Sequence, residues 1–480
     1  MAPPWHAACF ALKHASFRQS HWMNLMEFIL RYSLMLIAVA LGGKVTHAND
    51  LKQLYELALM RDTVLQIAHF QRDASVEVQP QALASLLPQV SANASATRER
   101  AGYDASQISS ASGASCALSA DAGAQHCYGT ARVLGLNLSQ TLWSFQAFNQ
   151  LKEANFQAAA AEATFRGAEQ SLLLRVAQAY FGILSASDQL ATNRSEREAF
   201  GTLLNQATVR QQTGVGPRTD VAQAQAFFDA TEQSIIDAQN ALDDANLALT
   251  EIVGPRADRI APLRDDIPLS SPEPASVDEW VISARQENFT VRAAQLKMEA
   301  ASRDVSAQRG RGLPTLQLTG SSSKTSQNQI LGGNQTLDTV GVSFSWPILQ
   351  GGAVASAVRQ SRALYAQAQA EFEGSLRDTE KQTRAAFRNI VSGVQRIAAA
   401  RRAVASGRDA VEASRRSVEF GTGKEFDLLN AQNNYYVAIR AYNQARYDYL
   451  TDVLTLKLEA GRLTERDLVA LDNLLVETNS

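Results

Sequence analysis

Side chains that commonly carry catalysis are gathered near the start of this sequence of 480 residues. All six His lie within the first 126 residues, and the three Cys are Cys9, Cys116 and Cys127. A His-based triad, zinc site or general base would have to be built from that stretch alone. The chain also has no Gly-x-Ser-x-Gly motif, no phosphate-binding loop and no Cys/His pairing. The sequence therefore predicts no enzyme and no bound cofactor or metal.

Two acidic residues stand out, Asp220 and Asp427, because each follows a similar Gly-containing turn. Residues 212–225 and 419–432 align with a shift of 207 positions, and both Gly, the Asp and a later Ala-Gln pair recur. Each Asp is expected at the start of a helix, where a carboxylate can cap free N–H groups and suits the helix dipole. Capping is therefore one interpretation of both residues.

The turn is one part of a repeat that covers nearly the whole chain. Residues 133–139 align with 339–345, and Leu-Pro motifs at 87 and 313 also correspond. Self-similarity of this kind predicts two copies of one unit of about 200 residues, joined by a Pro-rich linker. The expected order is a signal peptide, a first repeat, a linker, a second repeat and a C-terminal tail, at 1–48, 49–264, 265–277, 278–475 and 476–480.

Each repeat contains a long stretch without Pro, at 145–212 and 352–420. As α-helix, each stretch would be about 100 Å long. After the turn, apolar residues recur at spacings of three and four over 219–253 and 425–458. This heptad pattern, kept in phase in both copies, predicts a second helix with coiled-coil packing. A soluble bundle is the alternative for one copy alone.

Apolar and polar residues alternate ahead of each long helix. The alternating stretches are about 87–97, 132–142, 313–321 and 339–347. A period of two predicts four strands per chain, with Trp143 and Trp346 at the junctions between strand and helix. Apolar-out, polar-in alternation with interfacial Trp is typical of a transmembrane β-barrel, although a half-buried soluble sheet shows the same alternation.

Four strands cannot close a barrel around a lumen, and open sheet edges do not occur in lipid. A membrane-spanning sheet therefore requires several chains to pool their strands, and three chains would give twelve strands with room for a pore. The long helices would then form a shared tube. The stretches 98–131 and 321–338, rich in Ser, Gly, Asn and Gln, are expected as loops on the outward side.

Export is indicated by the first residues of the chain. Residues 34–41 form a short apolar run after Arg31, followed by small residues before Asn49, which is the pattern of a signal peptide. Without residues 1–48 the chain has 41 Lys and Arg against 47 Asp and Glu and no basic stripe, so no nucleic-acid partner is expected. In an oxidising compartment Cys116 and Cys127 are candidates for a disulfide, and two free thiols are the alternative.

Taken together, these features resemble the TolC family of outer-membrane efflux and type I secretion channels. The most diagnostic residues are 54–58 (Leu-Tyr-Glu-Leu-Ala), the Leu-Pro-x-Leu-x-Leu at 313–318 and the segment 342–352. The resemblance implies a homotrimer in the outer membrane of a Gram-negative bacterium, with a twelve-stranded barrel, a periplasmic coiled-coil α-barrel and an equatorial belt. It further implies a periplasmic adaptor and an inner-membrane ABC or proton-driven transporter as partners.

In this family the tunnel entrance lies at the helix–turn–helix tips, where acidic rings and links between helices control opening. By resemblance, Asp427 corresponds to a ring aspartate, and Thr219 and Asp220 correspond to a linking pair. The sequence departs from the best-known member at Asn430, where a second ring Asp stands, and at Gly423, where a linking Arg stands. Two nearby cations, Arg218 and Lys424, are candidates to replace that Arg.

The expected function is a passive exit duct, most consistent with type I protein secretion. A multidrug or small-molecule efflux channel served by a proton-driven exporter is the alternative within transport. A secreted coiled-coil filament or adhesin is the alternative from another class, but it would require neither alternating strands with Trp at their ends nor a duplicated turn.

Overall fold

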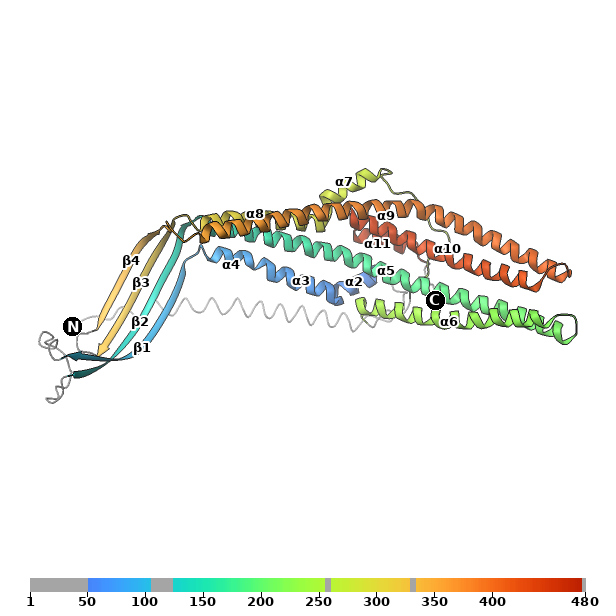
Figure 1. The fold of residues 1–480 in the computed structure, drawn as a ribbon, viewed down its shortest axis with the longest axis horizontal. Coiled ribbons are helices and arrows are strands. Elements are labelled where there is room, and N and C mark those ends of the chain that lie inside the picture. Colours follow the sequence, from blue (N-terminus) through green and yellow to red (C-terminus); the bar gives the residue numbers. More distant parts are fainter. Residues whose placement is uncertain (1–50, 105–123, 255–259, 329–333, 477–480) are drawn as a thin grey trace, which may run out of the picture. The chain divides into compact units, whose positions relative to one another are not determined.

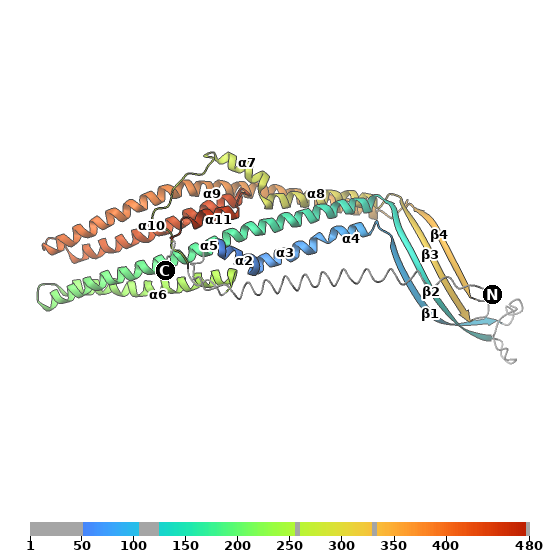
Figure 2. The same cartoon turned by 180° about the vertical axis from the view of Figure 1, so that it is seen from behind.

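The computed structural model describes residues 51–104, 124–254, 260–328 and 334–476. The elements in chain order are α2 (Leu51–Arg61), α3 (Thr63–Val76), α4 (Val78–Ala84), β1 (Gln89–Asp104), β2 (Ala124–Ser144), α5 (Phe145–Gln212), α6 (Arg218–Val253), α7 (Val277–Glu287), α8 (Phe289–Gly310), β3 (Thr315–Asn328), β4 (Gln335–Ser345), α9 (Ala353–Glu419), α10 (Glu425–Glu459) and α11 (Glu465–Asp472). Figures 1 and 2 show α5 and α9 continuing from the strands to two helical hairpins.

The four strands form one antiparallel sheet in the order β1-β2-β3-β4. The register places Leu134 opposite Ala94 and Leu136 opposite Ala92, so one face is largely apolar. The other face is polar, and on it Asn137 donates to the side chain of Asn93 at 2.9 Å. Because β1 and β4 form the edges of the sheet within the described part of one chain, further chains are required to close it.

The strands extend farther than the alternation of apolar residues indicated. Strand pairing continues to Asp104 opposite Ala124 and to Asn328 opposite Thr130, so part of the expected loops at 98–131 and 321–338 is strand. The periodicity missed these outer ends because the largely apolar face carries Arg98 and Lys324 there, although strand pairing continues. Alternation of apolar and polar side chains no longer indicates a strand where polar residues occupy both faces, but the backbone can still pair there.

The long helices pack through small side chains. Helix α5 has 68 residues and no Pro. Ser144 caps its start, because its Oγ accepts from the backbone N of Ala147 at 3.2 Å. Its buried Ala160 and Ala163 contact Ala293 and Leu296 of α8. In α6 three small heptad residues are buried, Ala224, Thr231 and Ala238, and the large residues Leu249 and Val253 are buried near its end. Small residues at these positions let neighbouring helices approach closely.

Helices also precede each pair of strands, which the expected β-β-α-α unit did not contain. The helices α2 to α4 come before β1, and α7 and α8 come before β3. The segment expected as a plain linker, 265–277, ends where α7 begins, and α11 lies within the last residues assigned to the second repeat. An antiparallel bridge joins Leu263, at the end of the first repeat, to Leu475, at the end of the second.

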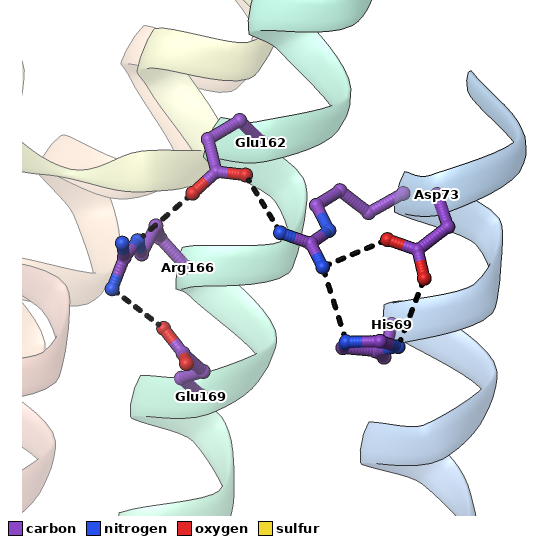
Figure 3. A network of polar contacts seen from close by, with 6 residues as sticks. His69, Asp73, Glu162, Arg166 and Glu169 are labelled. Atoms are coloured by element: carbon purple, nitrogen blue, oxygen red, sulfur yellow. Dashed lines mark hydrogen bonds and ion pairs between the residues drawn. The ribbon is translucent and has the colours of Figure 1, made fainter. Parts of the chain in front are cut away.

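Polar contacts fix the N-terminal helices against α5. Asp62 caps α3 by accepting from Leu65 N at 2.6 Å, and Arg175 of α5 donates to both of its carboxylate oxygens at 2.8 and 3.0 Å. Farther along α3, Arg72 lies between Asp73 and Glu162 of α5 in a network that includes His69, Arg166 and Glu169 (Figure 3). His69 is therefore part of a structural contact between helices.

Candidate functional site

The two hairpin turns have the same backbone geometry, as expected from the repeat. Gly214 has φ of 76° and Gly421 has φ of 72°, a left-handed conformation that favours glycine. The backbone N–H groups of Val215 and Gly216 both donate to the carbonyl of Arg210, at 2.9 and 3.0 Å. Thr422 and Gly423 repeat this by donating to the carbonyl of Ser417, both at 2.9 Å. Each long helix thus ends in a closed, hydrogen-bonded turn.

Gly423 has a structural reason to be glycine. A Cβ atom added to it would lie 2.7 Å from the Cβ of Ser417 and 3.1 Å from its carbonyl carbon. Both neighbours are held by the turn itself, so a side chain here would require the backbone to move. The close approach of Ser417 therefore leaves no room for a side chain at Gly423.

Asp220 and Asp427 lie in the first turns of α6 and α10, where their charge suits the helix dipole. The prediction that these carboxylates cap free backbone N–H groups is wrong for the described residues. The N-cap residues are Pro217 and Lys424, and neither Asp accepts a hydrogen bond from a backbone N–H of the described residues. Asp427 is exposed and Asp220 is half-buried. The Asp427 carboxylate is thus available to solvent at the start of its helix.

An ion pair between Arg210 and Glu425 lies near the tips. The Arg210 guanidinium, at the end of α5, donates to Oε2 of Glu425, at the start of α10, over 2.6 Å. Glu425 is 5% exposed, and its Oε1 is buried without a hydrogen-bond partner among the described residues. The pair therefore ties the first hairpin to the second.

The surroundings of Glu425 oppose its ionisation. Burial raises the pKa of its carboxyl above the usual range, Arg210 lowers it, and the negative charge of Asp220 raises it. Of these influences burial is the largest. Asp220 is thereby close enough to affect the ion pair, although it forms no ion pair with a described residue.

Sequence reasoning missed both members of this pair, although the pattern contained a signal. Glu425 stands three and four residues before Leu428 and Leu429, which are buried in a cluster with Phe200 and Leu203. A charged residue in register with an apolar stripe is expected to have a buried partner. The heptad pattern of the second copy begins at Leu428, so it did not include the Glu three residues earlier.

The remaining expected entrance residues are not brought together within one chain. Arg218, Thr219 and Lys424 are exposed, and no ion pair joins either cation to a described residue. The Asn430 amide donates to the backbone carbonyl of Phe426 in its own helix at 2.9 Å. None of these residues forms the link that the resemblance implied.

A second set of links lies about three to six helical turns farther along α10 from Glu425. Arg440 donates to Oε2 of the buried Glu196 at 2.5 Å and to Oδ1 of Asn193 at 3.2 Å. The Tyr436 hydroxyl donates to the carbonyl of Ser195 at 3.0 Å, and that of Tyr447 donates to Asp188 at 2.7 Å. These contacts fix α10 against α5 with directed bonds.

At the other end of the helices, the two Trp residues lie where the alternation placed them. Trp143 is the penultimate residue of β2 and Trp346 directly follows β4, and both side chains are exposed. Cys127 lies in β2 opposite Ala101, whereas Cys116 falls outside the described residues, so the expected disulfide stays a prediction.

No candidate metal site is present among the described residues. They contain no group of three or more His, Cys, Asp or Glu side chains placed to hold a metal ion. None of the described helices is long and apolar enough to cross a membrane.

The chain combines a four-stranded sheet that has an apolar face with two long helical hairpins, one in each repeat. This is the architecture of an outer-membrane export channel. The chain belongs to the outer membrane efflux protein family, whose model matches residues 54–255 and 280–462. The two matched segments fall in the two repeats. Channels of this family are trimers that work in tripartite export systems, so three sheets of four strands form the twelve-stranded barrel.

Several relatives are similar over most of their length. The chain is 30% identical to outer membrane protein TolC of Escherichia coli (strain K12) over 463 residues, covering 93% of this chain and 90% of the relative. It is 31% identical to the alkaline protease secretion protein AprF of Pseudomonas aeruginosa, with 69% and 70% covered. These similarities confirm the outer-membrane location, the periplasmic extension and the role of exit duct, and they exclude the filament alternative.

Solved structures agree on the fold. The outer-membrane channel OprN superposes with a TM-score of 0.73 at 21% identity, covering 86% of this chain and 89% of that chain. The channel VceC of Vibrio cholerae superposes with a TM-score of 0.71 at 20% identity, covering 86% and 96%. Family members are channel proteins, in keeping with the absence of a catalytic motif from the sequence.

Proposed function

We propose that this chain is the outer-membrane exit duct of a type I protein secretion system. A periplasmic adaptor and an inner-membrane ABC transporter would be its partners. The observation that carries the proposal is the similarity to two protease secretion proteins, AprF and PrtF of Dickeya chrysanthemi, the latter 28% identical over 91% of this chain. A passive duct of this kind needs no catalytic centre.

A second candidate is multidrug or small-molecule efflux with a proton-driven exporter. It is favoured by 28% identity to the outer membrane efflux protein BepC of Brucella suis over 71% of the chain. The match covers 74% of that protein, against 94% of PrtF, and AprF, of which 70% is covered, has the higher identity of 31%. Protein secretion is therefore the better supported of the two.

One experiment separates the two candidates. A host lacking its own outer-membrane export channel receives this chain together with either an ABC transporter–adaptor pair and its protein substrate, or a proton-driven exporter–adaptor pair. Protein in the medium with no change in drug susceptibility supports secretion. Restored drug resistance without protein in the medium contradicts it and supports efflux.

We propose further that the hairpin tips form the periplasmic entrance. In a trimer, the exposed Asp427 carboxylates would surround one axis and concentrate negative charge there. Arg210 and Glu425 would hold the two hairpins of each chain together, and Arg218 and Lys424 would form the contacts with neighbouring chains that Gly423 cannot form. The entrance would then open when these links break.

The membrane end of the chain carries proposals of its own. Trp143 and Trp346, exposed where strands meet helices, would lie in the inner interface of the outer membrane and contact lipid. Residues 1–48 would be removed on export, and Cys116 and Cys127 would form a disulfide on the outward side. Non-reducing mass spectrometry of the purified protein would test both statements at once.

A further inference from the structure

Two cations lie on the membrane-facing side of the barrel sheet. Arg132 of β2 pairs with Ser326, and Lys324 of β3 pairs with Leu134. Residues that pair across antiparallel strands share a face, so both cations lie on the face of Leu134 and Leu136, the largely apolar one. Their positions are diagonal neighbours, about 7–8 Å apart at the backbone. Both side chains are exposed, whereas Val133 and Thr325 on the opposite face are half-buried.

The height of these cations coincides with the outer headgroup layer. Arg132 is eleven residues from Trp143 along β2, which is about 37 Å of strand, or about 27 Å of height at the usual tilt. Lys324 is nine residues from Thr315, the first residue of β3, which gives about 22 Å by the same geometry. The apolar band of such barrels is about 25 Å tall. If the Trp residues mark the inner interface, the two cations mark the outer one.

The surface around them combines charge with an apolar floor. A hollow of about 460 Å³ is lined by Arg132, Lys324, Ala94, Ala96, Leu134 and Ser326. Arg98, opposite Thr130, lies on the same face and adds positive charge. Asp338, which lies opposite Ser322, is an acidic residue of the same face, and Asp104 at the end of β1 is another by the register. Neither Arg132 nor Lys324 forms an ion pair with a described residue.

We infer that Arg132 and Lys324 bind the phosphate groups of a phosphorylated glycolipid in the outer leaflet. Arg recognises phosphate through two parallel N–H donors, and Lys contributes a point charge beside it. The alanines and Leu134 below them would contact the acyl chains of the same molecule. A free phosphate would use the cations but leave this apolar floor unoccupied, so the surface fits a lipid.

Native mass spectrometry of the detergent-solubilised trimer tests the inference, with bisphosphorylated lipid A and its dephosphorylated form as probes. The wild-type trimer is expected to retain up to three lipid A molecules and at least tenfold less of the dephosphorylated form. The double variant Arg132→Gln/Lys324→Gln should lose lipid A retention at least tenfold. The matched control Arg401→Gln/Arg402→Gln removes two exposed cations from α9 and should retain lipid A as the wild type does.

Two further variants separate charge from folding. Arg132→Lys/Lys324→Arg keeps both charges and should retain lipid A to within about threefold, and Asp338→Asn should retain more than the wild type. Inorganic phosphate at millimolar concentration should not displace the lipid. Equal retention by the Gln variant and the wild type, equal retention of the dephosphorylated probe, or full displacement by inorganic phosphate would each overturn the inference.

Discussion

At the scale of single residues, the buried carboxylate of Glu425 is the most consequential group near the tips. Removing one partner of a buried ion pair leaves the other without compensation. Because Arg210 is half-exposed, we expect Glu425→Ala to destabilise the closed tips by about 1–3 kcal/mol. Single-channel recording in planar bilayers should show a larger mean conductance than in the wild type.

Two variants control that experiment. Glu419→Ala removes an exposed carboxylate at the end of α9 and should leave the conductance unchanged. The exchange Arg210→Glu/Glu425→Arg restores an ion pair across the same elements and should return the conductance toward the wild-type value. Conductance that is the same in Glu425→Ala and wild type would show that the pair does not restrain opening.

Asp427 carries a separate prediction about ions. Three exposed carboxylates around one axis attract cations, so Asp427→Ala should reduce the preference for cations and weaken block by divalent ions about tenfold. Reversal potentials in asymmetric salt and titration with Mg²⁺ measure the two effects. Asp409→Ala, which removes an exposed carboxylate farther back along α9, is the control. Unaltered reversal potentials and block in Asp427→Ala would refute the ring.

The sequence predicts where these acidic residues lie in their helices, but it does not predict which residues they or their neighbours contact. The repeat placed Asp220 and Asp427 at helix starts, and the structure has them in first turns. It could not reveal that Arg210 meets Glu425, because these residues are 215 positions apart and come from different repeats. Contacts between repeats depend on how two hairpins dock, which periodicity within one hairpin does not encode.

At the scale of elements, two pairs of packed helices, α5 with α8 and α10 with α9, each place a partly buried Glu near an Asp of the other helix. Burial, helped by Asp304 of α8, raises the pKa of Glu153 in α5 to about 7. Burial, helped by Asp378 of α9, raises the pKa of Glu459 in α10 to about 7. A raised carboxyl pKa stabilises the fold below about pH 4.5, and this stabilisation is lost as the pH rises through 7.

We therefore expect Glu153→Gln and Glu459→Gln to stabilise the protein more at pH 8 than at pH 5. Each group is only partly buried, so the gain at pH 8 is about 1 kcal/mol per substitution. Thermal unfolding of the trimer at both pH values measures the difference. Glu279→Gln, an exposed carboxylate of α7, serves as control. A shift in melting temperature that is the same at both pH values would contradict this.

The elements themselves follow closely from pattern. Helix α5 occupies Phe145–Gln212, the range indicated by the absence of Pro, and α6 and α10 begin just after the Gly turns. The helices α2 to α4, α7 and α8 were not part of the expected β-β-α-α unit, which was based on the strands, the long stretches without Pro and the heptads. The outer ends of the strands were missed where the largely apolar face becomes basic at Arg98 and Lys324.

At the scale of the whole molecule, the duplication explains why a chain of 480 residues carries so little chemistry. Two long hairpins and four strands supply one third of a tube, and the edges of the sheet demand partners. Length in this protein provides reach across the periplasm and the outer membrane. His69 and the other polar groups of the described helices hold elements together, which suits a duct that conducts and does not transform its cargo.

The most direct test of this role is conductance of the purified outer-membrane protein in planar bilayers. A trimer that resists dissociation until heated should insert and give uniform, long-lived conductance steps, and the same trimer should be recovered from the outer-membrane fraction of cells. A protein that fractionates as a soluble monomer, or a membrane-inserted trimer that gives no steps, would contradict the assignment as an exit duct.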